Sequence, residues 1–518
     1  MIKRLILFFL INYCVIIFCD AQIRFNKRIV IDSLPKTINS IYPTDSCYYG
    51  IGGISDTINL LAFGNIFYKF DLEGNLLFEK RITNQNKTYE AWKQTKLNSL
   101  GELVSIGYTK DTSDINWKSW FVKYNLEGDT ILTKEHISPN YNLTNDPFYS
   151  PLDFLETPDS GYIFIANTAN TYKDVAVTRL DIDGNELWSK TYGNIYDDIV
   201  YNIISDGDNY IICGITNTNG LGSTSSTFSM YLFSIDIDGN ELWSYVAPAS
   251  EGIEIASDII KAPDGGYFVA AYIETEIVGS SEYTVGSIAK LNENFEVEWH
   301  HPIYHEQASN INVLSTIVEE EIDTAFTTWG VQVGDISDTV WGIQPWMARV
   351  SVDGDSLWSR SYTFLGLESY LRHQFFDVRR TPDGGYIMCG ESIDFSPDGS
   401  GDGQKGWLIK VDEYGCLVPG CHLDTSTDDP LSITQATLKV YPNPTSEYLN
   451  VYYKNKASKV EGFFRLVDIQ GRVVFSFGAT QRDTTYMIDL GNYSPGIYFL
   501  QYFEDGRLSK TEKIIIQK

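Results

Sequence analysis

The sequence predicts an all-β protein, a seven-bladed β-propeller followed by a small Ig-like β-sandwich. Three observations lead to this prediction. The 518-residue chain contains 34 Tyr, 27 Phe and 41 Gly but only 5 Met, and this composition favours strands and turns over helices. A turn centred on glycine returns seven times along the chain. A segment of different composition follows the last of these turns.

The first 21 residues have the features of a signal peptide. Lys3 and Arg4 precede an apolar run of 14 residues, which is too short to span a bilayer comfortably. Small residues follow, so we expect cleavage between Ala21 and Gln22. Cys19 could instead carry a lipid, but Phe18 before it is larger than the residue that such a site requires. The mature chain is expected to be secreted and not transmembrane.

The formal net charge of the chain is -29. A field of this sign repels the phosphates of nucleic acids and the head groups of anionic lipids. Nucleic acid is therefore not an expected partner, and the charge suits a soluble extracellular protein.

The repeated turn defines seven copies of one unit. The copies are spaced by about 57 residues on average, which fits a propeller blade of four strands with generous loops. The residues at the turn position are Gly74, Gly128, Gly184, Gly239, Phe295, Gly354 and Gly415. Four residues later comes an aromatic side chain in most copies, and we interpret it as a packing residue rather than a ligand platform. These residues are Phe78, Trp188, Trp243, Trp299 and Trp358, with Leu132 at this position in the second copy.

The turn sequence "DIDGNELW" resembles two functional motifs only superficially. An EF-hand loop needs flanking helices and a glutamate at its twelfth position, whereas a Trp-bearing strand follows here. The Asp-box of sialidases needs a different spacing between Asp and Gly. We therefore interpret the motif as a hairpin turn. A basic residue five positions before the glycine, such as Arg179, and an acidic one three before, such as Asp181, lie on one strand face and predict a ladder of paired charges.

A second signature, for example "TPDGGYIMCG" at 381–390, lies upstream in several copies. It predicts a tight turn followed by an apolar strand, so that each copy becomes a four-stranded antiparallel meander. The last copy lacks its Trp-bearing strand, while residues 25–31 form an extra strand at the mature N-terminus. We expect this strand to complete the last blade and close residues 22–421 into a ring, which removes exposed sheet edges.

Five cysteines remain after the signal peptide. Export permits disulfides, and "GCLVPGC" places Cys416 and Cys421 across a short Pro/Gly turn, so we expect them to pair. Cys213 and Cys389 occupy the same place in two copies of the repeat and are interpreted as buried strand residues.

Residues 422–437 are polar and predict a linker, and residues 438–518 predict a small β-sandwich. The stretches "KVYPNPTSEYLNV", "VDIQGRVV", "DLGNYSPGIYFLQ" and "KIIIQK" resemble the type A C-terminal sorting domain of the type IX secretion system of Bacteroidota. The residues of these motifs that we single out are Tyr441, Pro442, Asn443, Pro444, Gly471, Pro495, Gly496 and Tyr498. The resemblance implies export across the outer membrane, removal of the domain by a sortase, and attachment of the remainder to surface lipopolysaccharide.

Few residues point to catalysis. Motifs of serine hydrolases, zinc peptidases and phosphate-binding loops are absent from the sequence. The histidine cluster "HHPIYH" at 300–305 could bind zinc only if its members converged, and Asp398 and Asp402 could hold calcium, but we expect a solvated loop there. The chain has 68 Asp and Glu, so no acidic pair can be selected as catalytic.

The sequence therefore predicts a secreted or cell-surface propeller that binds a glycan or protein ligand, without a catalytic residue or cofactor that can be named. The alternative is a glycan-processing enzyme, a hydrolase or lyase, built on the same scaffold. A quinone-dependent dehydrogenase is a third reading, although such enzymes usually have eight blades.

Overall fold

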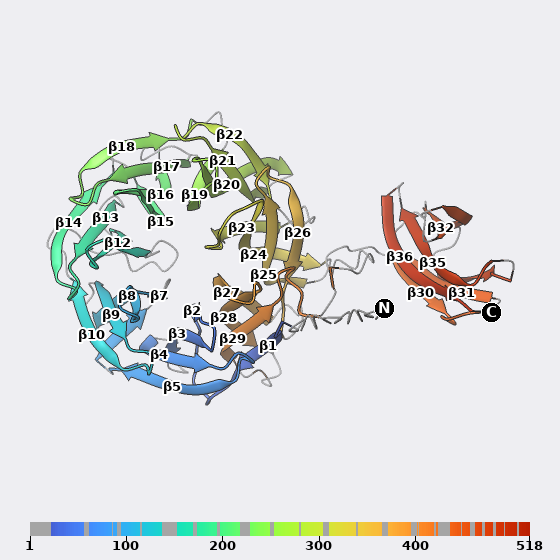
Figure 1. Ribbon diagram of the computed structural model, residues 1–518, viewed down its shortest axis with the longest axis horizontal. Coiled ribbons are helices and arrows are strands. Elements are labelled where there is room, and N and C mark those ends of the chain that lie inside the picture. Colours follow the sequence, from blue (N-terminus) through green and yellow to red (C-terminus); the bar gives the residue numbers. More distant parts are fainter. Residues whose placement is uncertain are drawn as a thin grey trace, which may run out of the picture.

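A computed structural model describes residues 22–517 except for 56–61, 85, 91–94, 114–116, 137–152, 169–173, 194–196, 218–227, 249–252, 279–280, 304–309, 338–339, 365–370, 395–400, 402, 419–420, 423–435, 447, 456–461, 469–471, 480–482, 492 and 505–506. Every regular element in these residues is a strand, as the composition predicts. Figure 1 shows most of the strands arranged in a ring of small sheets, and a separate group formed by the C-terminal strands.

The first half of the ring consists of antiparallel meanders in chain order. The first is β2 (Ser40–Pro43), β3 (Tyr48–Ser55), β4 (Ala62–Phe70) and β5 (Leu76–Thr83). The second is β7 (Thr95–Leu97), β8 (Leu103–Asp111), β9 (Lys118–Tyr124) and β10 (Thr130–His136), with β6 (Lys87–Glu90) also paired to β8. The third is β11 (Phe154–Glu156), β12 (Tyr162–Asn167), β13 (Val175–Leu180) and β14 (Glu186–Tyr192). The fourth is β15 (Asp198–Asp206), β16 (Asn209–Asn217), β17 (Phe228–Ile235) and β18 (Glu241–Val246).

The second half of the ring is one 12-stranded sheet made of three such groups. Single parallel bridges, Val285 to Asn312 and Ile343 to Arg372, join the groups. The first group is β19 (Ile253–Lys261), β20 (Tyr267–Val278), β21 (Ser281–Leu291) and β22 (Val297–Pro302). The second is β23 (Asn310–Ile317), β24 (Ala325–Ser337), β25 (Val340–Ser351) and β26 (Ser356–Ser361). The third is β27 (Leu371–Arg380), β28 (Tyr386–Asp394), β29 (Gly403–Val411) and β1 (Phe25–Ile29).

The N-terminal strand β1 is thus the outer strand of the last group. It pairs antiparallel with β29, with Phe25 opposite Lys410 and Ile29 opposite Gly406. Figure 1 shows it at the boundary between the last and the first groups of the ring, where chain segments far apart in sequence meet.

Hydrophobic cores lie between neighbouring sheets of the ring. The core between the third and fourth meanders, for example, combines Ile163 and Val177 with Ile212 and Phe233, all fully buried. Burial from both sides explains why the middle strands read as continuous apolar runs, whereas the outer strands, such as β14, alternate between exposed and partly buried residues.

In "IICG" and "IMCG" a glycine follows the buried cysteine because the backbone of the innermost strand lies very close to that position. A Cβ atom at Gly214 would lie 1.9 Å from the carbonyl oxygen of Ile199, and one at Gly390 would lie 1.9 Å from that of Gln374. Each contact lies next to an irregularity in the register of the innermost strand. Cys213 and Cys389 are themselves buried in β16 and β28, in agreement with their interpretation as strand residues.

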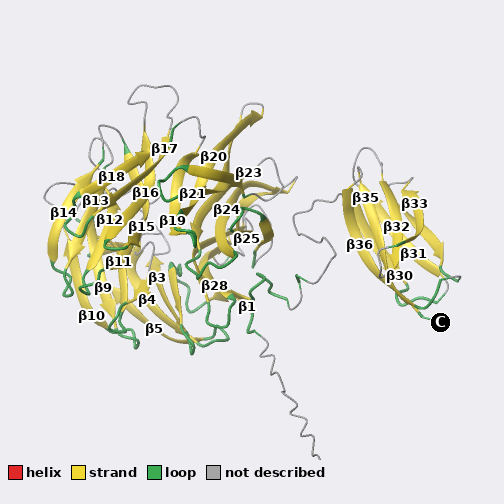
Figure 2. Ribbon diagram, turned by 45° about the horizontal axis from the view of Figure 1, so that its top comes forward, coloured by secondary structure: helices red, strands yellow, loops and turns green. Residues whose placement is uncertain are grey.

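The C-terminal residues form two sheets around one core. The first sheet contains β30 (Ala436–Tyr441), β31 (Tyr448–Asn455) and β34 (Asp483–Asp489). The second contains β33 (Val473–Ala479), β32 (Gly462–Asp468), β35 (Gly496–Glu504) and β36 (Arg507–Ile516). Leu449 and Tyr453 of the first sheet share a core with Phe464 and Leu500 of the second. Figure 2 shows the two layers.

Candidate functional site

The repeated acidic turn is closed by its own side chains. In the third repeat, the Asp181 carboxylate accepts hydrogen bonds from the backbone N–H groups of Asp183 and Asn185, at 2.9 and 2.8 Å, and from the Asn185 side chain at 2.9 Å. The turn residue Gly184 has a φ of 71°, and even Phe295, in the glycine's place, has a φ of 64°. The Asp181 carboxylate is thus engaged in closing the turn.

In four copies the tryptophan after the turn packs on the turn of the next repeat. A Cβ atom at Gly239 would lie 2.7 Å from Cη2 of Trp188, and the Nε1–H of Trp188 donates to the carbonyl of Ile237. Trp299 covers Gly354 and Trp358 covers Gly415 in the same way. Where phenylalanine replaces the glycine, the rings of Trp243 and Phe295 have centroids 4.1 Å apart. These Trp side chains are partly buried between repeats, so they are neither fully enclosed nor free platforms.

The predicted ladder of charges is wrong in its partners. Arg179 forms an ion pair with Asp159 of the second signature rather than with Asp181, which caps its own turn. Lys290 likewise pairs with Asp264 at 2.9 Å, and Lys410 with Asp383 at 3.0 Å. The basic side chain therefore joins the two turns of one repeat, because both turns lie at the same end of the meander.

Three buried aspartates, on or beside the innermost strands, join neighbouring groups of strands in the ring. Asp258 accepts hydrogen bonds from the Thr316 hydroxyl at 2.5 Å and from the backbone N–H of Ile317 at 2.7 Å. Asp377 accepts from the Ser40 hydroxyl and the Ile41 N–H, both at 3.0 Å. These carboxylates thus accept backbone N–H groups of the innermost strands β23 and β2.

Asp153 has the same role toward the next sheet. Its carboxylate accepts from the Asn202 side chain at 3.1 Å and from the Ile203 N–H at 3.3 Å, while Lys96 lies at 3.3 Å. The sequence analysis did not predict these three aspartates. A signal for them is nevertheless present, since each stands six residues before the aspartate of a Pro-Asp-Gly or Pro-Asp-Ser turn.

Asp258 titrates abnormally. Burial, together with the nearby Asp153 carboxylate, raises the pKa of Asp258 from 3.8 to about 6 against the opposing effect of the hydrogen bonds from Thr316 and Ile317. A protonated fraction of this carboxyl group is therefore present near neutral pH.

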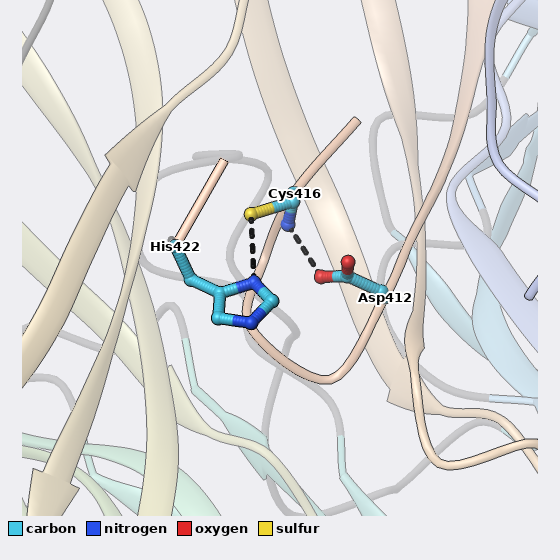
Figure 3. Close-up of side chains that lie close together, drawn as sticks. All are labelled: Asp412, Cys416 and His422. Carbon is cyan, nitrogen blue, oxygen red and sulfur yellow. Dashed lines mark hydrogen bonds between the residues drawn. The ribbon is translucent and has the colours of Figure 1, made fainter. Parts of the chain in front are cut away.

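Cys416 and Cys421 form a disulfide, as expected from their spacing. The disulfide also bears on the side chains in Figure 3, where Asp412, Cys416 and His422 offer ligand atoms within 4.8 Å of one another. A cysteine binds zinc as a thiolate, and the Cys416 sulfur is instead bonded to Cys421. The Asp412 carboxylate accepts the Cys416 N–H at 2.8 Å and pairs with Arg24 at 2.8 Å. The cluster therefore fits a structural turn better than a metal site.

The other sequence candidates contribute little to a site. His300 and His301 are exposed on β22, while His305, Asp398 and Asp402 lie outside the described residues. Of the expected signal cleavage site, Ala21 also lies outside, and the Gln22 side chain donates to the carbonyl of Asp383 at 2.6 Å.

The sorting-motif residues hold the C-terminal strand in place. The Asn443 side chain donates to the Lys513 carbonyl at 2.5 Å and accepts the Ile515 N–H at 2.9 Å. The neighbouring Thr445 exchanges backbone hydrogen bonds with Ile515 and Gln517, at 2.9 and 2.8 Å. "YPNP" and "KIIIQK", which are far apart in sequence, thus meet at one edge of the domain.

The remaining motif residues are distributed between core and surface. Tyr498 is 9% exposed and its hydroxyl donates to the Ser494 carbonyl, whereas Tyr441 is 51% exposed. Pro495 and Gly496 are exposed where β35 begins, Pro442 and Pro444 follow cis peptide bonds, and Gly471 lies outside the described residues.

Known structures resemble the chain only distantly. They include a Penicillium chrysogenum α-L-arabinanase complexed with arabinobiose, with 10% identity, a TM-score of 0.40, and coverage of 62% of this chain and 92% of that one. The β-propeller domain of the Trilobed protease from Pyrococcus furiosus has 10% identity and a TM-score of 0.39, with coverage of 74% of this chain and 99% of that one. Drosophila Semaphorin 1a, extracellular domains 1–2, has 9% identity and a TM-score of 0.42, with coverage of 76% of this chain and 89% of that one. Likeness at this level carries no argument about activity.

No curated protein sequence matches the chain. No helix long and apolar enough to cross a membrane occurs among the residues that the structure describes. One family does match, the secretion system C-terminal sorting domain, over residues 439–517. This match covers the sandwich in which "YPNP" and "KIIIQK" meet. Residues 439–517 are therefore a C-terminal sorting domain of the type IX secretion system, and the protein is exported by that system to the cell surface or the extracellular space.

Proposed function

We propose that residues 22–421 form a seven-bladed β-propeller that binds a glycan or protein ligand outside the cell. In this proposal the Ig-like sandwich at 438–518 delivers the propeller and is then removed by a sortase within or near the linker at 422–437. The propeller carries the activity of the mature protein.

The contacts between repeats support the seven-bladed ring. The aromatic side chain that covers the next turn recurs around the ring, and Phe25 of β1 supplies it for the last repeat by lying over Gly74. A basic residue two positions after this aromatic side chain also recurs. Lys80 contacts Asp129 at 2.5 Å, and Lys27 of β1 contacts Asn75 at 2.6 Å. The blade completed by β1 therefore meets the first blade as other blades meet their neighbours.

The observation that carries the binding role is the use of the central carboxylates. Glycosidases need two carboxyl groups free to act on a bound sugar. Asp153, Asp258 and Asp377, which lie on or beside the innermost strands, are instead hydrogen-bonded to the next group of strands. Their engagement supports a structural role and favours binding over hydrolysis.

A cavity of about 280 Å³ beside the end of β19 supports the same preference. Its lining is mostly apolar, with Ile260, Ala262, Pro263 and Ile322, and it includes the adjacent carboxylates Glu319 and Glu320. Glu320 is fully buried and ion-paired to both Arg349 and Arg380. Glu319 has 81% side-chain exposure and pairs with Arg379 at 3.3 Å, so this cavity does not offer a pair of free carboxyl groups.

The test is to purify the protein released by native cells and apply it both to a glycan array and to labelled polysaccharides. We expect saturable binding to a defined glycan or surface protein, with no new reducing ends after prolonged incubation. Asp258→Asn should bind like the native protein. Multiple-turnover release of sugar that Asp258→Asn abolishes would establish the alternative, a glycan-processing enzyme.

A further inference from the structure

One outward sheet face of the sorting domain is apolar and basic. In β32, Phe464 and Leu466 point into the core and are fully buried, so the alternate residues Phe463 and Arg465 point to solvent. A sheet face in contact with water usually carries polar side chains. Phe463 therefore occupies a position where its burial by a partner would stabilise a complex.

The apolar character continues along the neighbouring strands. On β35, Phe503 pairs with Phe463, and Phe499 and Ile497 follow on the same face, with Ile497 41% exposed. Ile515 of β36 stands opposite Ile497. Phe463, Arg465, Ile497, Phe499, Phe503 and Lys513 are referred to below as the basic–aromatic face.

Arg465 is fixed on this face by its aromatic neighbours. The rings of Phe463 and Phe503 are parallel within 3°, with centroids 4.9 Å apart, and the Arg465 guanidinium lies 4.8 Å from each centroid. The ion pair in the described part of this domain joins Arg472 to Asp468 and does not involve Arg465. A stacked guanidinium keeps its N–H edge available for a carboxylate.

The sorting motifs support the same face. The Asn443 side chain binds the backbone of Lys513 and Ile515, and thereby fixes β36 at the edge of the sheet. The Lys513 side chain is exposed on the outward side, because Ile514 and Ile516 fill the core. "YPNP" and "KIIIQK" thus present a second cation beside the aromatic residues.

We propose that the basic–aromatic face is the surface by which the sorting domain docks on a protein of the export machinery. The partner presents carboxylates next to apolar side chains, which complement Arg465 and Lys513 and the rings between them. Aromatic residues and arginine dominate the energetics of protein interfaces. A flat sheet face suits a protein surface better than a single phosphate group of lipopolysaccharide. The proposal rests on export through the sorting domain.

The experiment follows export of the full chain from a bacterium with a type IX system, as the ratio of extracellular to periplasmic protein. We expect Arg465→Glu and Lys513→Glu each to lower this ratio about tenfold, the effect of a loss of about 1.4 kcal/mol in binding. For Arg465→Lys this ratio should lie between that of the native chain and that of Arg465→Glu. The matched control is Met487→Ser on the other sheet, where Met487 is 69% exposed, and its ratio should equal that of the native chain.

Two further arms separate the possible failures. Truncation at residue 437 should abolish export. If it does so while Arg465→Glu and Phe463→Ser/Phe503→Ser export normally, the docking surface is wrong although the export route is right. If the truncated chain is exported, the export route itself is wrong. Loss of binding to lipopolysaccharide-containing vesicles in an Arg465→Glu chain that is exported normally would assign the face to lipopolysaccharide and overturn the proposal. Thermal unfolding of each purified chain checks that the variants fold.

Discussion

Phe25, in the first strand of the ring, lies over Gly74 in the first repeat. A Cβ atom at residue 74 would stand 2.5 Å from Cζ of Phe25, and Gly74 has a φ of 75°. Glycine is therefore required there both by its backbone angle and by the ring above it. The same relationship joins Trp188 to Gly239 and Trp358 to Gly415, which belong to consecutive repeats. Between Phe25 and Gly74 this contact joins the last repeat, completed by β1, to the first.

Deletion of residues 22–32 should lower the melting temperature by several degrees or more, because the last sheet loses its outer strand and the first turn loses its cover. Calorimetry of the purified protein measures this directly. Val30→Ser provides the control, since Val30 is 61% exposed and its replacement should leave the melting temperature unchanged. An unaltered melting temperature after the deletion would argue against ring closure by β1.

Trp188→Ala should lower the free energy of unfolding by about 2 kcal/mol, less than for a fully enclosed aromatic residue, because Trp188 is only partly buried between two repeats. Urea denaturation provides the measurement. The adjacent Leu187, 56% exposed, is the matched control, and Leu187→Ala should change the stability by less than about 0.5 kcal/mol. Equal effects at both positions would mean that Trp188 does not join the repeats.

Asp258 should make stability fall as pH rises from 4 to 7. Its folded-state pKa of about 6 lies above the ordinary value of 3.8, so in this interval the folded protein binds the proton more tightly than the unfolded chain. Relative to Asp258→Asn, the native protein should gain up to about 3 kcal/mol as pH falls from 7 to 4. Denaturation curves for both proteins across this range test the sign, and parallel pH profiles would show that Asp258 is not perturbed.

Asn443→Ala should destabilise the sorting domain by about 1 kcal/mol, because the Lys513 carbonyl and the Ile515 N–H both lose their partner. Asn443→Asp keeps the acceptor for Ile515 but loses the donor to Lys513, so its effect should be smaller. Hydrogen exchange in β36 reports the change locally. Unchanged protection of β36 in Asn443→Ala would contradict the role of this side chain.

Local patterns in the sequence predicted the elements of the ring well. The turn at Gly184 and the register of Trp188 depend on residues a few positions apart, and the spacing of Cys416 and Cys421 was sufficient to pair them. The partner of Arg179 was predicted wrongly because Asp159 and Asp181 are both near in sequence. The fold brings Asp159 beside Arg179, whereas Asp181 closes its own turn.

Contacts between distant segments could not be read in advance. Asp377 binds Ser40 and Ile41 across the closure of the ring, and nothing in a chain with 68 acidic residues singles it out without the repeat alignment. The contact of Asn443 with β36 likewise depends on how the two sheets of the sorting domain meet. The motif was recognised from the sequence, but the physical role of its asparagine required the structure.

Intact mass spectrometry of the protein released from native cells tests the central claim most directly. The account predicts a chain that begins near Gln22 and ends within or close to residues 422–437, because the sorting domain is used for export and then removed. A mature protein that still carries "KIIIQK" would contradict removal of the domain.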